Sequence, residues 1–124
     1  MTLCYKVFRV VPAGLQSFST VYPLTYTPRA RTTAPPHTAI FAFRDHASAS
    51  ALLDWGGRPY HYQLWRCNGT APRKLPTAIW KIPFVDTAQH LTAFWRRRAA
   101  HIYLYPWPPG TVCYKHLTPL ERVQ

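Results

Sequence analysis

Acidic residues are scarce in this 124-residue sequence. Asp and Glu together number 4 against 15 Lys and Arg, which gives a formal net charge of +11 at pH 7. General acid–base and two-metal catalysis both depend on several carboxylates. Asp45 and Asp86 are each expected to cap a helix, so no pair of carboxylates is left for catalysis. We therefore expect a protein that is not an enzyme and has no catalytic residue.

Cysteine is also sparse, and its positions are isolated. Cys4, Cys67 and Cys113 each lie in an apolar, strand-like run without a C-x-x-C pair, and the six histidines match no metal-ligand spacing. We expect free, buried thiols in a reducing intracellular compartment, with no metal and no cofactor. No run of about 18 apolar residues and no basic-then-apolar leader is present, so neither a membrane span nor a secretory signal is expected.

Glycine is scarce (5) whereas proline is abundant (13). The prolines cluster at residues 23–36, 72–83 and 106–119. Proline lacks a backbone donor, so these stretches should be extended and without regular ladders. We interpret residues 28–37 and 106–124 as Pro-rich extended arms of a single basic domain that spans residues 1–124. Surface loops of a compact domain are the alternative for these stretches.

Apolar residues make up 48% of the chain, enough for one hydrophobic core. Residues 39–67 form its centre, where an apolar run leads into Asp45, an alanine-rich segment, Gly56-Gly57 and an aromatic run ending at Cys67. The carboxylate of Asp45 can accept hydrogen bonds from the first helical turn, and glycine ends helices. This pattern predicts a strand, a short helix and a second strand.

Flanking patterns extend the sheet on both sides. Residues 3–11 predict a strand that ends at Pro12 and Gly14, and Pro23 places residues 17–27 at a sheet edge or breaks them in two. One face of the first strand would carry Cys4, Lys6, Phe8 and Val10, and the other Tyr5, Val7 and Arg9. Residues 69–76 read as a basic turn.

Asp86 followed by Gln89 resembles a capping box, which predicts a second helix over residues 87–99. Residues 101–105 alternate as a strand, and residues 111–117 look like its hairpin partner. Together, these patterns predict a small α+β domain: a mostly antiparallel sheet of about five or six strands, with two short helices packed on one side.

Basic and aromatic residues alternate at several places, for example at Arg58–Tyr62 and Phe94–Arg98. Such strands suit single-stranded nucleic acid, because bases stack on rings while cations follow phosphates. The competing interpretation is a core on one face and solvated cations on the other. The candidate polyanion or partner contacts are Arg58, Arg66, Arg73, Lys74, Arg96, Arg97 and Arg98.

A series of short motifs also carries a resemblance. It comprises Tyr5-Lys6-Val7-Phe8-Arg9, Ser17-Phe18-Ser19, Tyr26, Ile40–Phe43, Ala47–Ala51 and Leu64-Trp65-Arg66-Cys67. Over about residues 4–67 this order resembles small uncharacterised proteins encoded by bacteriophages and large DNA viruses. The resemblance implies an α+β fold and a viral origin.

The arrangement of an Arg on the first strand and a Ser on the second strand resembles that of ADP-ribosyltransferase folds. That likeness implies that Arg9 and Ser17 or Ser19 would hold a nicotinamide dinucleotide. The catalytic Glu of that family has no counterpart, because residues 101–117 contain no acidic residue. The likeness therefore points to a non-catalytic relative, with a transferase as the distant alternative.

Charge, proline content and the viral likeness together favour a structural or interaction protein. We expect a small, minor component of a larger assembly such as a viral capsid or nucleoprotein particle, with acidic surfaces of other protein subunits as its partners. A nucleic-acid-binding protein that uses the basic and aromatic residues is the alternative.

Overall fold

The structure is a computed structural model, and it describes residues 2–17, 24–36, 38–55, 61–75, 79–80, 104–105 and 109–124. Strands account for 62% of these residues, and the only helix among them is α1 (His46–Trp55). The fold is therefore mostly β, and the expected α+β class with two helices packed on one side of a sheet is wrong.

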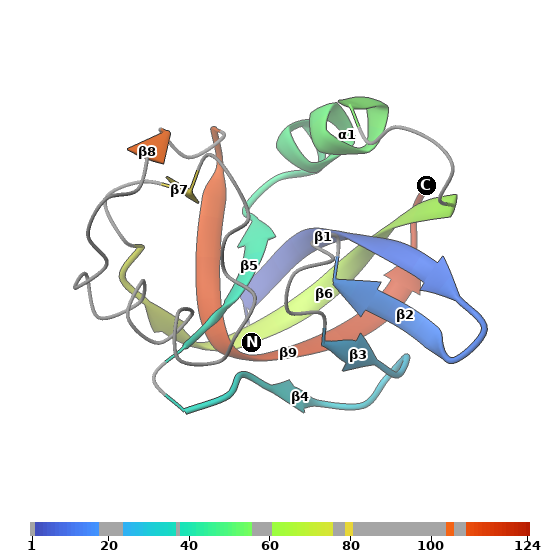
Figure 1. The fold of residues 1–124 in the computed structure, drawn as a ribbon, viewed down its shortest axis with the longest axis horizontal. Coiled ribbons are helices and arrows are strands. Elements are labelled where there is room, and N and C mark those ends of the chain that lie inside the picture. Colours follow the sequence, from blue (N-terminus) through green and yellow to red (C-terminus); the bar gives the residue numbers. More distant parts are fainter. Residues whose placement is uncertain are drawn as a thin grey trace.

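Four strands close into a small antiparallel barrel (Figure 1). They are β1 (Thr2–Val11), β5 (Ile40–Phe43), β6 (His61–Arg73) and β9 (Thr111–Arg122). β1 pairs with β6, β6 with β9, and β9 with β5, and β5 returns to β1 through Tyr5 opposite Phe43. The four strands therefore form a closed ring and not an open sheet. Alternating polarity predicts strands but not which strands pair, and for that reason the closure was not predicted.

Three short strands extend the barrel: β2 (Gly14–Ser17), β3 (Thr25–Tyr26) and β4 (Thr32–Thr33). β1 turns into β2 through Pro12 and Ala13, and Gly14 has a φ of 128° that favours glycine. The second strand therefore starts at residue 14, three residues before the predicted start, and β3 pairs with β2.

The predicted C-terminal hairpin is also wrong. β9 pairs with β4, β5 and β6, while β8 (Leu104–Tyr105) pairs with β7 (Ile79–Trp80) in a separate two-stranded sheet. β6 continues through Arg73, so the basic turn expected over residues 69–76 is in large part strand. The second helix predicted at residues 87–99 lies outside the described residues.

The two faces predicted for β1 are confirmed. Cys4 and Phe8 are fully buried inside the barrel, whereas Val7 packs on the outer face in a separate cluster. The barrel core contains Cys4, Phe8, Leu15, Tyr26, Ala34, Ile40, Ala42, Cys67, Tyr114 and Leu117. Inward and outward side chains alternate because successive residues of a strand point to opposite faces.

Helix α1 covers part of the outer face, beside β1, β5 and β6 (Figure 1). Ala49 is completely buried there, in one cluster with Val7, Phe43 and Leu64, against which Leu52 and Leu53 pack. This apolar side accounts for the helix predicted after Asp45. The barrel is thus packed on its inside and, along α1, on its outside.

The two segments expected as arms are held within the chain in their described parts. The Arg29 N–H donates to the Pro119 carbonyl oxygen (2.7 Å), and the Ala34 N–H donates to that of Lys115 (2.9 Å). The Lys115 ammonium donates to the Ala34 carbonyl oxygen (2.8 Å). Residues 28–36 and 109–124 therefore support each other, with β9 as a barrel strand.

Candidate interaction surface

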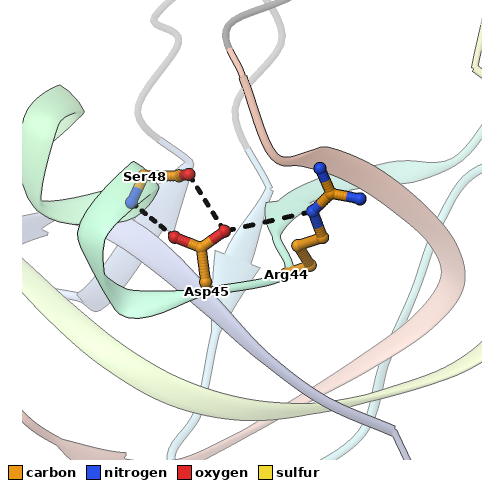
Figure 2. Close-up of polar contacts among 3 residues, drawn as sticks. All are labelled: Arg44, Asp45 and Ser48. Atoms are coloured by element: carbon orange, nitrogen blue, oxygen red, sulfur yellow. Dashed lines mark hydrogen bonds and ion pairs between the residues drawn. The ribbon is translucent and has the colours of Figure 1, made fainter.

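Asp45 is committed to capping helix α1 (Figure 2). Its Oδ1 accepts a hydrogen bond from the Ser48 N–H (2.8 Å), its Oδ2 accepts one from the Ser48 hydroxyl (3.1 Å), and Arg44 Nε lies 4.0 Å from Oδ2. The hydrogen bonds from Ser48 lower the pKa of the Asp45 carboxyl. The predicted N-cap is confirmed, and this carboxylate is engaged in the fold.

Glu121 is engaged as well. It lies opposite Arg66 in the β6–β9 pairing, and the two side chains form an ion pair. Asp45 and Glu121 are the acidic residues whose side chains the structure describes, and each lies beside an arginine. Arg66, one of the predicted partner contacts, therefore already has a carboxylate partner.

Lys6 lies inside the barrel with 8% of its surface exposed. Its ammonium group donates a hydrogen bond to the Phe41 carbonyl oxygen and lies 6.0 Å from the ring centre of Phe8 and 5.9 Å from that of Tyr26. Burial lowers the pKa of Lys6 to about 8. The alternation of β1 placed Lys6 on the core face, but the sequence did not show that the amine is buried.

All three cysteines are free and buried, as predicted. Cys4 and Cys67 lie directly opposite each other across β1 and β6. Burial raises the pKa of Cys4 to about 12 and that of Cys113 to about 11, and it also raises the pKa of Cys67. The thiolate is the nucleophile and metal ligand, so these thiols are held in their unreactive form. The described side chains contain no cluster of His, Cys, Asp or Glu that could hold a metal.

Aromatic residues near the basic positions pack into the fold. Trp65 lies against the barrel core and donates from Nε1 to Gln63 (3.0 Å), Tyr62 lies against the cluster under α1, and Tyr114 is 5% exposed. Stacking of bases requires exposed ring faces. For these three residues the alternation of basic and aromatic residues reflects packing on one side and solvation on the other.

The structure brings together only part of the predicted contact set. Arg73 and Lys74 are exposed at the end of β6, and Arg73 lies about 23 Å along the strand from Arg66 at roughly 3.3 Å per residue. Arg58, Arg96, Arg97 and Arg98 lie outside the described residues.

The predicted contact residues did not include Arg29 and Arg31, two exposed cations in the segment between β3 and β4, although residues 28–37 were expected to form a basic arm that binds a partner. The available signal was the proline at position 28, because Pro favours the second position of a turn and so constrains the backbone next to Arg29. We use the term basic surface for two groups of exposed cations, Arg29 and Arg31 before β4 and Arg73 and Lys74 at the end of β6. None of the four has a carboxylate partner among the described side chains.

Arg9 and Ser17 do not converge on one ligand position. Arg9 lies opposite Gln16 and donates to its Oε1 (2.6 Å), whereas Ser17 lies opposite the buried Phe8 and accepts from the Leu24 N–H (3.1 Å). Neighbouring positions of a strand face opposite sides. The nicotinamide dinucleotide site implied by the ADP-ribosyltransferase likeness is therefore not assembled from this pair, and Ser19 lies outside the described residues.

The sequence matches no protein-family model, and comparison with curated proteins and with solved structures gives no match. The viral and ADP-ribosyltransferase resemblances stay predictions. Within the described part of the chain, no helix is long and apolar enough to cross a membrane.

Proposed function

We propose that this protein is a non-enzymatic interaction protein, a small component of a larger assembly such as a viral capsid or a nucleoprotein particle. Its basic surface would lie against acidic surfaces of neighbouring subunits. The observation that carries the proposal is a set of exposed cations that have no carboxylate partner among the described side chains, including Arg29, Arg31, Arg73 and Lys74, on a chain of net charge +11.

Electrostatics supports an acidic partner. Both described carboxylates already lie beside arginines, so they do not reduce the field of the basic surface. The cations of the basic surface repel one another. They also attract negatively charged surfaces, over a distance of roughly 10 Å at ordinary salt. Carboxylates of an acidic neighbour would offset the repulsion among these cations and would be attracted to them.

Packing favours a protein partner over single-stranded nucleic acid. Trp65 and Tyr114, which adjoin Arg66 and Lys115, pack against the barrel core, and Tyr62 packs against the cluster under α1; Tyr114 is buried, and Trp65 and Tyr62 are half-buried. A base-stacking surface needs those rings exposed. Binding of nucleic acid through phosphates alone is the alternative, and it predicts a steep fall in affinity with salt.

A direct test measures fluorescence anisotropy of labelled poly-glutamate and of labelled single- and double-stranded DNA, at low and at physiological salt. We expect poly-glutamate to bind, and Arg73→Gln/Lys74→Gln to weaken that binding more than Arg44→Gln/Arg66→Gln. The two variants lose equal charge, but the control pair lies beside carboxylates. Absence of poly-glutamate binding at low salt contradicts the proposal, and tighter binding of DNA at physiological salt favours the alternative.

A further inference from the structure

Residues 27–30 form a tight turn whose geometry is unusual for its sequence. The Ala30 N–H donates to the Thr27 carbonyl oxygen (3.1 Å), which closes a β-turn with Pro28 and Arg29 at its centre. Proline fixes a φ near −65° at the first central position, and Arg29 has a φ of +63° at the second. A negative and then a positive φ define a type II turn.

Arginine is disfavoured at that position. The second central residue of a type II turn is normally glycine, because a side chain is strained at positive φ. Arg29 is exposed, so burial of its side chain does not offset the strain. Glycine would fit this turn at least as well as arginine. The needs of the fold therefore do not explain why an exposed guanidinium is present here.

Backbone hydrogen bonds hold the turn firmly. The Arg29 N–H donates to the Pro119 carbonyl oxygen on β9 (2.7 Å), and β4 begins at Thr32 and pairs with β9 immediately afterwards. Arg31, also exposed, lies between these two anchors. The backbone that carries both arginines is therefore fixed to a barrel strand, and only their side chains need to be ordered when a partner binds.

We infer that Arg29, supported by Arg31, is the principal contact of the basic surface and that it binds carboxylates of an acidic protein partner. This inference rests on the proposed function. A guanidinium binds a carboxylate through two parallel hydrogen bonds, and this geometry is not available to lysine. A preformed backbone reduces the ordering that binding requires, so a contact on this turn contributes more than an equal charge on a mobile side chain elsewhere.

Separate variants distinguish this contact from general attraction by charge. Arg29→Gly removes the guanidinium and places the favoured residue at the positive φ. Arg29→Lys keeps the charge without the planar fork, and Arg44→Gln removes one exposed charge that lies beside the Asp45 carboxylate. Labelled poly-glutamate is titrated at low salt, and thermal unfolding is followed by circular dichroism.

We expect Arg29→Gly to bind poly-glutamate about five-fold more weakly and to unfold at a temperature equal to or above that of the wild type. Arg29→Lys should lose about two-fold, and Arg44→Gln less than two-fold.

Equal losses in Arg29→Gly and Arg44→Gln would overturn the inference and leave the proposed function in place, because binding would then follow net charge. Unchanged binding by Arg29→Gly also overturns it. If the wild type fails to bind poly-glutamate, the proposed function itself is contradicted. Binding of DNA but not of poly-glutamate, with loss in Arg29→Gly, overturns the carboxylate assignment in favour of phosphate.

Discussion

The ammonium group of Lys6 on β1 donates a hydrogen bond to the carbonyl oxygen of Phe41 on β5. These two strands close the barrel, and their register contains the single pair Tyr5 opposite Phe43. Lys6 therefore adds a side-chain link at the place where the ring has the fewest backbone contacts. The link places an amine in an apolar interior, where its charge is poorly solvated.

Replacement of Lys6 by methionine should stabilise the protein at pH 7. The gap between the ordinary pKa of 10.5 and about 8 in the fold, at about 1.4 kcal/mol per pH unit, makes burial of the charge cost about 3 kcal/mol. The lost hydrogen bond to Phe41 offsets about 1 kcal/mol. We expect Lys6→Met to raise the free energy of unfolding by about 2 kcal/mol, measured by urea denaturation in reducing buffer.

The pH dependence of that gain tests its cause. Between about pH 8 and pH 10.5 the unfolded chain keeps the proton of Lys6 and the folded chain does not, so the stability of the wild type rises relative to Lys6→Met. The advantage of the variant should be full below pH 8 and shrink through pH 10.5. A constant advantage across this range would show that packing, not charge burial, is responsible.

Above pH 9 the wild type should become less stable because of its thiols. Burial raises the pKa of Cys4 to about 12 and of Cys113 to about 11, from an ordinary value of 9.0. The stabilisation from protonated thiols is complete below pH 9 and is lost as the pH rises toward the folded values. Native protein at pH 8 should resist iodoacetamide, while protein in urea should react at three cysteines, counted by mass spectrometry. Rapid native labelling would contradict burial.

Gly69 is expected to tolerate no side chain. A Cβ at this position would lie 2.5 Å from Cδ2 of Tyr114, whose ring is 5% exposed and held in the core. Gly69→Ala should therefore lower the free energy of unfolding by about 1–3 kcal/mol through overpacking. In a Tyr114→Leu background the same substitution should cost less, because the ring is absent. Equal losses in both backgrounds would place the strain elsewhere.

Asp45→Ala should lower the melting temperature, because helix α1 loses the acceptor of the Ser48 N–H. Asp45→Ser keeps a side-chain oxygen and serves as the control. Since the pKa of Asp45 is lowered from 3.8 in the fold, its stabilisation is present above about pH 4 and lost as the pH falls further. The difference between Asp45→Ala and the wild type should therefore narrow in acid, as followed by circular dichroism.

Local patterns predicted local structure well. The alternation over residues 3–11 specified a strand and both of its faces, and Asp45 specified the start of α1, since these features depend on neighbours in sequence. The buried cysteines followed from the apolar runs that contain them.

Long-range pairing was beyond such patterns. Pro119 marked the C-terminal segment as an arm, yet it is buried in β9, where a register shift between Arg66 and Cys67 interrupts the β6–β9 ladder beside it. A bulge of this kind accommodates a residue that cannot donate to the ladder. Of the predicted contact residues, Arg73 and Lys74 are exposed and Arg66 is paired with Glu121, whereas the positive φ of Arg29 cannot be seen in its sequence.

The position of β9 in the barrel has a consequence for synthesis on the ribosome. This strand is made after every other described strand, yet it pairs with β4, β5 and β6. Until it emerges, β1 and β6 cannot enclose the apolar face that carries Cys4 and Phe8. Contacts between such distant segments form slowly, and exposed strand edges promote aggregation. We therefore expect nascent chains that stop before residue 111 to depend on chaperones, and the barrel to fold cooperatively only once β9 has emerged from the ribosome.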